Sequence, residues 1–203
     1  MARVGRPSKA AERRREVLAA AAEIFSQRGY RATTMNEIAA AAGLTKPTLY
    51  HYFRNKEELL VRLYHDVLDQ SVQQAKDIVE QIDDPAAALR ALIKQRVVAT
   101  CTSRAMFKVF FEEEEELPHD MAQVLLRRRR DYEDIFKEVL SHSSFEETAP
   151  TGIDATLFLN TCLGAANWTY KWYDPNGPLT PDEIGDHIAA NVLARLTPVA
   201  ESS

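Results

Sequence analysis

Residues 33–56, TTMNEIAAAAGLTKPTLYHYFRNK, hold the side chains of this chain best suited to enter a nucleic-acid groove. The pattern predicts two short helices joined by a tight turn at Gly43, and no Asp or Glu occurs between Glu37 and Glu57 to repel phosphate. A short helix with small or polar side chains at its leading end suits the major groove of DNA. We therefore predict a helix-turn-helix whose second helix contacts DNA through Thr45, Lys46, Pro47, Thr48, Tyr50, His51 and Tyr52.

Phosphate contacts are expected along this helix and beside it. The hydroxyls of Tyr50 and Tyr52 can donate to phosphate oxygens, and Lys56 can neutralise a phosphate at the start of the next helix. Helix N-terminal amides form a further anion site. Thr34, at the start of the preceding helix, is also an expected DNA contact. The arm that carries Arg3 and Arg6 has two interpretations: insertion into a narrow minor groove, or a solvated tail that binds phosphates loosely.

The rest of the sequence predicts helices almost throughout. Strand-like alternation is absent, glycine is scarce, and apolar residues recur at helical spacing. We expect an all-α fold of about nine helices, in which a three-helix helix-turn-helix head over 1–54 precedes a helical body over 55–203. The expected helices cover 9–28, two short segments within 33–54, then 56–81, 85–101, 103–111, 118–142, 154–173 and 181–197.

Charge is distributed unevenly along the chain. The net charge of −5 would by itself argue against a nucleic-acid partner. Residues 1–56, however, hold 11 Lys and Arg against 4 Asp and Glu, whereas residues 57–203 hold 14 against 26. A basic N-terminal part followed by an acidic remainder is typical of a protein that touches phosphates at one end only.

Several classes of protein are disfavoured by composition and spacing. No apolar run is long enough to span a membrane, and no apolar segment follows the N-terminal positive charges, so we expect a cytoplasmic protein without a membrane partner. Cys101 and Cys162 are therefore expected to be reduced, buried and small apolar side chains. The histidines and cysteines have no metal-ligand spacing, and the prediction includes no metal, cofactor or catalytic residue.

Residues 9–56 resemble the DNA-binding domain of the TetR family of transcriptional regulators. The resemblance lies in Phe25 and Gly29 at the end of the first helix, Thr33-Thr34, Ile38-Ala39, Ala42-Gly43, residues 45–53, and Asn55 to Leu59. Pro47 departs from the glycine that many members have there, at a first-turn position where proline is tolerated. The resemblance implies a homodimer that binds a palindromic operator in double-stranded DNA as a repressor, with a variable body whose ligand moves the fourth helix and releases the DNA.

The same resemblance implies that the last two helices pair with those of a second subunit. The apolar row from Ile184 to Leu196 fits such a seam or an ordinary core. The tail WYxPxGPLTxxxI is similar to that of members that regulate fatty-acid and steroid breakdown, which implies a lipid-derived or acyl-CoA ligand. A drug or aromatic ligand is the alternative. The expected ligand-binding residues are Met106, Phe107, Phe110, Phe111, Tyr132, Phe136, Gly164, Trp168 and Trp172, although the two tryptophans fit a core or interface as well.

Two charged runs have more than one interpretation. Arg127 to Arg130 fits a solvated helix face that pairs with Glu112 to Glu116, Asp131, Glu133 and Asp134, or a source of positive charge for an anionic ligand. Glu112 to Glu116 is expected to be solvated.

Two other functions compete with a ligand-responsive repressor. An enzyme acting on an apolar substrate lacks support, because no GxSxG, phosphate-loop or dinucleotide-binding pattern occurs. An architectural DNA-binding protein would not need a large acidic body.

Overall fold

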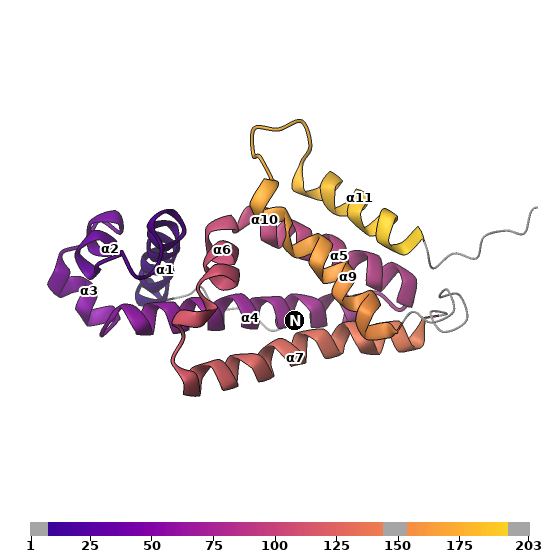
Figure 1. Ribbon diagram of the computed structural model, residues 1–203, viewed down its shortest axis with the longest axis horizontal. Coiled ribbons are helices and arrows are strands. Elements are labelled where there is room, and N and C mark those ends of the chain that lie inside the picture. Colours follow the sequence, from indigo (N-terminus) through magenta and orange to yellow (C-terminus); the bar gives the residue numbers. More distant parts are fainter. Residues whose placement is uncertain (1–7, 144–153, 195–203) are drawn as a thin grey trace, which may run out of the picture. The chain divides into compact units, whose positions relative to one another are not determined.

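The computed structural model describes residues 8–143 and 154–194, and every regular element within those ranges is a helix (Figure 1). The expected all-α fold is confirmed. No helix in the described ranges is long and apolar enough to cross a lipid bilayer.

Each of the first three helices begins after a residue whose side chain accepts a hydrogen bond from a backbone N–H of the first turn. Helix α1, Lys9–Arg28, begins after Ser8 and ends at Gly29, which has a φ of 81°. Helix α2, Met35–Ala41, has a capping box between Thr34 and Glu37. Helix α3, Lys46–Tyr52, is capped by Thr45, whose hydroxyl accepts from the Thr48 amide at 3.4 Å. Gly43, with a φ of 63°, makes the turn between α2 and α3, in the left-handed region that favours glycine.

The middle of the chain consists of two long helices, a short helical segment and a third long helix. Helix α4 spans Lys56–Gln81, and α5 spans Pro85–Thr102. Helix α6, Arg104–Glu112, and the 3₁₀ turn η1, Glu114–Glu116, precede the long helix α7, His119–His142.

The single helix expected over 154–173 is wrong. The structure has α9, Ala155–Asn167, and a separate short helix α10, Thr169–Trp172, with Trp168 between them. The buried hydroxyl of Thr169 donates to the carbonyl oxygen of Ala166 at 2.7 Å, and this local bond competes with the helical ladder. Helix α11, Pro181–Leu193, begins at the expected cap Thr180, and Leu196 lies outside the described residues.

Contacts divide the chain into two compact units. The head unit contains the described residues through Val67 together with Ala105–Leu125, and the body unit contains Leu68–Arg104 and the described residues from Leu126 onward. The domain boundary expected between residues 54 and 55 stays a prediction, since these units are defined by contacts alone.

The head unit has a small apolar core. Phe25, Ile38, Leu49 and Phe53 are all buried, as the amphipathic pattern of α1 to α3 predicts. Leu59, Leu60 and Leu63 of α4 are also buried, so the first turns of α4 belong to this unit.

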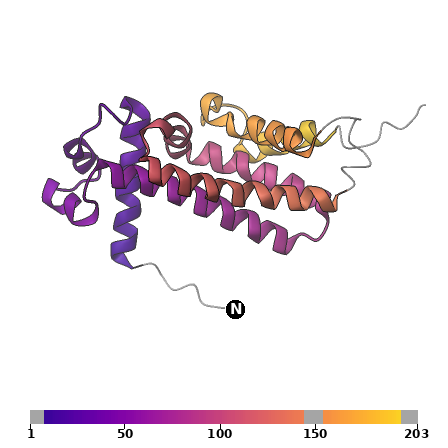
Figure 2. The same ribbon diagram turned by 60° about the horizontal axis from the view of Figure 1, so that its bottom comes forward.

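The body unit is built around α5, which contacts both α9 and α11 (Figures 1 and 2). Gly185 of α11 faces Lys94 of α5 so closely that an added Cβ would lie 3.2 Å from both the Cα and the carbonyl oxygen of Lys94. The buried cluster of this unit includes Leu92, Phe136, Phe158 and Ala189. Ile184 and Leu193 of the apolar row are buried within one subunit, which favours the core interpretation for these two positions.

Both cysteines are free and buried, as expected. Desolvation raises the pKa of Cys162 to about 12 and also raises that of Cys101, so neither side chain is a thiolate at neutral pH.

Candidate nucleic-acid interface and ligand-binding body

Helix α3 presents a continuous exposed face to solvent. Leu49 is buried, whereas Lys46, Thr48, Tyr50 and His51 are exposed. The structure therefore brings most of the predicted reading residues to one accessible surface: Thr45, Lys46, Pro47, Thr48, Tyr50 and His51, with Tyr52 half-buried beside them. Their roles in DNA binding stay predictions, and Arg3 and Arg6 of the arm lie outside the described residues.

The hydroxyls at the helix starts already have partners. Thr34 donates to Glu37 Oε2 at 2.8 Å, and Thr45 and Thr48 share a hydrogen bond of 2.8 Å. Bonds from Thr34 hold the pKa of the Glu37 carboxyl below its usual range, and Arg28 pairs with the same carboxylate at 2.6 Å. The Thr34 hydroxyl thus caps α2, and its contact with DNA stays a prediction.

Lys56 occupies a position that the sequence alone did not indicate. Its Nζ donates to the carbonyl oxygens of Tyr30, Arg31 and Thr33 at 2.7, 3.2 and 2.9 Å, and it lies 4.3 Å from the centre of the Tyr30 ring. The first residue of α4 thus holds the turn between α1 and α2. A phosphate contact would have to share an ammonium that already has three acceptors.

We expect Lys56→Met to lower the free energy of unfolding by about 1–3 kcal/mol, because three carbonyl oxygens lose a charged donor. Affinity should fall on every DNA sequence while the dependence of affinity on salt stays unchanged. Denaturant unfolding and binding titrations at several salt concentrations measure both quantities, with the exposed Lys76→Met as the matched control. A salt slope shallower by about one would instead establish a direct phosphate contact.

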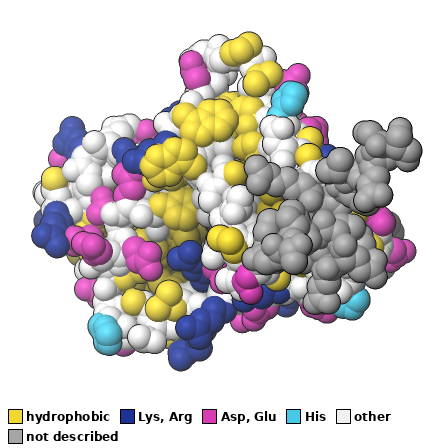
Figure 3. Space-filling view, turned by 45° about the vertical axis from the view of Figure 1, so that its right-hand side comes forward, with side chains coloured by type: hydrophobic (Ala, Val, Ile, Leu, Met, Phe, Trp, Pro, Cys, Tyr) yellow, Lys and Arg dark blue, Asp and Glu magenta, His cyan; other side chains and the backbone are white. Residues whose placement is uncertain are grey.

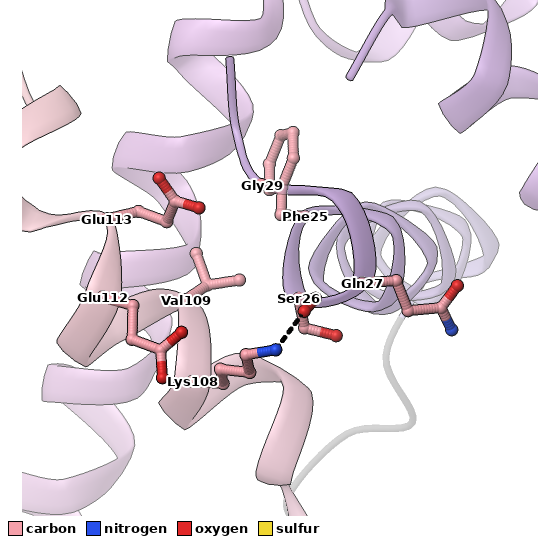
Figure 4. Close-up of a pocket in the computed structure, with 8 residues that line it drawn as sticks. All are labelled: Phe25, Ser26, Gln27, Gly29, Lys108, Val109, Glu112 and Glu113. Atoms are coloured by element: carbon pink, nitrogen blue, oxygen red, sulfur yellow. Dashed lines mark hydrogen bonds between the residues drawn. The ribbon is translucent and has the colours of Figure 1, made fainter. Parts of the chain in front are cut away.

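The α6–η1 segment holds the same turn from another side. Glu113 Oε1 accepts from the Tyr30 amide at 2.9 Å, and Glu116 pairs with Arg31 at 2.6 Å. Lys108 Nζ donates to the carbonyl oxygen of Ser26 near the end of α1 (Figure 4). Ser26, Lys108 and Glu113 also line a polar pocket of about 140 Å³. The expectation of a fully solvated acidic run is therefore wrong for Glu113 and Glu116, and no local sequence signal indicates these long-range partners.

The expected ligand-binding residues fall into two groups. Met106, Phe107, Phe110 and Phe111 lie in the head unit, where Phe107 and Phe110 are buried. The Phe110 ring lies 4.9 Å from the Tyr64 ring, and the buried Tyr64 hydroxyl donates to the Val109 carbonyl oxygen at 3.2 Å.

The second group lies in the body unit but is not uniformly buried. Tyr132 and Phe136 are buried with ring centres 5.2 Å apart, whereas Gly164 is exposed and Trp168 and Trp172 have exposed fractions of 59% and 51%. Figure 3 shows one face of the molecule, on which several apolar side chains are exposed. Within this unit the two tryptophans therefore do not share the buried environment of Tyr132, and their roles as ligand contacts stay predictions.

Two members of the arginine run have acidic partners, of which Asp131 and Glu133 were predicted by the solvated-face interpretation and Asp69 was not. Arg128 lies 2.9 Å from Asp69 and 3.2 Å from Asp131, and Arg129 lies 3.2 Å from Glu133.

Comparison with known proteins identifies the family. Residues 17–63 match the profile of bacterial regulatory proteins of the tetR family, and residues 82–196 match that of a tetracyclin repressor-like C-terminal domain. The chain belongs to the TetR family of transcriptional regulators, as the resemblance implied.

Relatives and solved structures match this chain over nearly its whole length. The chain is 30% identical over 186 residues to the transcriptional repressor KstR2 of Mycobacterium tuberculosis H37Rv, covering 91% of this chain and 93% of that protein. The structure of that ketosteroid regulator matches with a TM-score of 0.81, covering 90% of this chain and 93% of that one. The structure of AibR with isovaleryl coenzyme A and operator DNA matches at 30% identity with a TM-score of 0.75, covering 88% and 97%.

Proposed function

We propose that the chain is a cytoplasmic homodimeric repressor that binds a palindromic operator and leaves it when a small lipid-derived acyl or acyl-CoA ligand binds the body. The observation that carries the proposal is the exposed face of α3, which is free of acidic side chains and rich in hydroxyl, amine and aromatic groups. Two copies of this helix in a dimer would enter successive major grooves roughly 34–36 Å apart.

The proposed dimer uses a face of the body unit that no described side chain covers. Along α9 and α10, Leu157, Gly164, Trp168 and Trp172 follow one another at helical spacing and are all exposed. The small side chains of Ala190 on α11 and of Ala194, the residue that follows this helix, are exposed as well. Large apolar groups beside small ones suit close packing of helices from two subunits.

The proposed response to ligand would act through the turn between α1 and α2. Lys56 of α4 and Glu113 and Glu116 of the α6–η1 segment all bond to residues 30–33. A change in the position of α4 or α6 would therefore shift the turn that leads into the helix-turn-helix. A difference of about 1–3 kcal/mol between the two states would weaken operator binding about 5–150-fold.

The ligand class is supported by two similar proteins. One is a ketosteroid regulator, and the other was solved with isovaleryl coenzyme A and operator DNA. The apolar core of the body unit suits the acyl chain of such a compound.

The test combines selection of DNA from a random pool with footprinting and competition by acyl-CoAs. We expect one short palindromic footprint that acyl-CoAs weaken 5–150-fold, with the acyl-CoA recovered intact. Continuous coverage of DNA would indicate an architectural protein, and hydrolysis of the acyl-CoA would indicate an enzyme. If only drugs or aromatic compounds release the protein from its operator, the proposed ligand class is wrong and the proposed repressor function stands.

A further inference from the structure

A cluster of polar side chains lies buried in the otherwise apolar body unit. Arg96 of α5, which is 5% exposed, donates from Nε to Asn167 Oδ1 of α9 at 2.7 Å and from Nη1 to Ser71 Oγ of α4 at 3.0 Å. Its guanidinium carbon lies 5.0 Å from the centre of the Tyr132 ring of α7. These four residues, called the Arg96 cluster below, come from four different helices.

The Tyr132 hydroxyl in this cluster has no hydrogen-bond partner among the described residues, although the side chain is 3% exposed. Burial raises the pKa of this phenol, and the neighbouring Arg96 only partly opposes that shift, so the phenol keeps its proton at neutral pH. Arginine has donors and no acceptor. The guanidinium can donate toward the Tyr132 oxygen but cannot accept the proton that Tyr132 offers, so that proton has no acceptor in the cluster.

A purely structural role accounts for only part of this arrangement. Arg96 can tie α4, α5 and α9 together through Ser71 and Asn167. Such a tie does not need a tyrosine hydroxyl, because phenylalanine would present the same ring to the guanidinium without a buried, unpaired polar atom. Desolvation lowers the pKa of Arg96, Tyr132 opposes that shift, and the positive charge of Arg129 adds to it. An oxygen acceptor that carries negative charge would stabilise the buried guanidinium.

We propose that the Arg96 cluster recognises an acyl oxygen of the regulatory ligand, either a carboxylate oxygen or the carbonyl oxygen of a thioester. The inference rests on the proposed function and names the part of the body that would bind the ligand's polar end. An acyl oxygen accepts hydrogen bonds, so it would take the proton of the Tyr132 hydroxyl and one from the guanidinium. The acyl chain would lie among neighbouring apolar residues such as Leu92, Phe136 and Val139.

The same geometry connects ligand binding to α4. Arg96, Tyr132 and Ser71 are all buried, so an incoming oxygen reaches them only when the helices part. Ser71 is the α4 member of the cluster, and a ligand oxygen that takes over Arg96 Nη1 would replace its hydroxyl. Helix α4 begins at Lys56, whose ammonium holds the turn between α1 and α2.

The decisive variant is Tyr132→Phe, which removes only the unpaired hydroxyl. The free protein should keep its fold, because the substitution preserves the ring and removes a hydroxyl whose proton has no acceptor among the described residues. Calorimetry should show about tenfold weaker binding of the probes that carry an acyl oxygen. The probes are saturated acyl-CoAs of four to sixteen carbons, the free acids of the same lengths and the matching alcohols. Tyr173→Phe, a half-buried tyrosine elsewhere in the body unit, is the control and should not alter binding.

A second variant tests the guanidinium. Arg96→Lys keeps the positive charge but loses the planar donor set, so probe binding should fall about tenfold or more while the circular dichroism spectrum is retained. If only the free acids bind, the recognised oxygen belongs to a carboxylate; if only the acyl-CoAs bind, it belongs to a thioester. Either result supports the inference.

Three outcomes would overturn the inference. Equal affinity of wild type and Tyr132→Phe for the binding probes would remove the Arg96 cluster from ligand recognition and leave the proposed function intact. Alcohols that bind as tightly as acids and thioesters would have the same consequence. If no probe binds while operator binding is retained, the acyl ligand class and the inference fail together, and the DNA-binding function stands.

Discussion

Gly164→Glu should convert the protein from a dimer to a monomer without unfolding the subunit. A Cβ at Gly164 would meet no atom within 4 Å, so the described subunit has room for a side chain there. The substitution also removes a glycine from the interior of α9, which favours the helix by up to about 1 kcal/mol. In the proposed dimer, by contrast, a carboxylate would be buried between two helices without a partner.

The consequence for DNA binding should be large. A monomer contacts one half-site, and loss of the linked second contact should weaken operator binding by about 10²–10⁴-fold. Analytical ultracentrifugation and fluorescence anisotropy with labelled operator measure the mass and the affinity. Gly164→Ala is the matched control and should remain dimeric, since a methyl group fits between closely packed helices. A Gly164→Glu protein that stays dimeric and binds normally would place the subunit interface elsewhere.

Lys46→Glu should abolish most operator binding while the fold is retained. Lys46 is the first residue of α3, is exposed, and makes no ion pair within the described residues. Its nearest aromatic neighbour is Tyr50, with Nζ 5.9 Å from the ring centre. Reversal of its charge would place a carboxylate among the phosphates, and we expect affinity to fall roughly 100-fold at physiological salt, with a salt slope shallower by about one.

Lys76→Glu is the control for that experiment. It produces the same change in net charge at another exposed position, on α4, and should alter operator affinity only a few-fold through the weaker long-range field. Binding titrations of both variants against salt concentration separate the two effects. Equal losses of affinity would mean that net charge, and not a contact of α3, determines binding.

Most helix boundaries could be predicted because they depend on local chemistry. The Thr34–Glu37 and Thr180–Glu183 capping boxes, the glycines at 29 and 43, and proline at the start of α5 each act over a few residues. The break at Trp168 could not be predicted in this way, because it accompanies a buried side-chain hydrogen bond of Thr169 that the helical pattern does not reveal.

The exposed surface of α3 was also predictable, since apolar and polar residues alternate at helical spacing on a short segment. The partners of Lys56, Glu113 and Arg96 were not. Lys56 bonds to carbonyls 23 to 26 residues away, Glu113 to an amide 83 residues away, and Arg96 to an amide oxygen 71 residues away. Contacts of that range depend on tertiary packing and leave no periodic signal in a single sequence.

The two tryptophans of this chain, Trp168 and Trp172, are exposed, and only four positions separate them. The tryptophan fluorescence of the protein therefore originates from one short stretch of the body unit. Emission wavelength and quenching by iodide or acrylamide follow the hydration of that stretch without an introduced dye. The helix-turn-helix holds tyrosines but no tryptophan, so selective excitation of tryptophan follows the body unit without a contribution from the DNA-binding part.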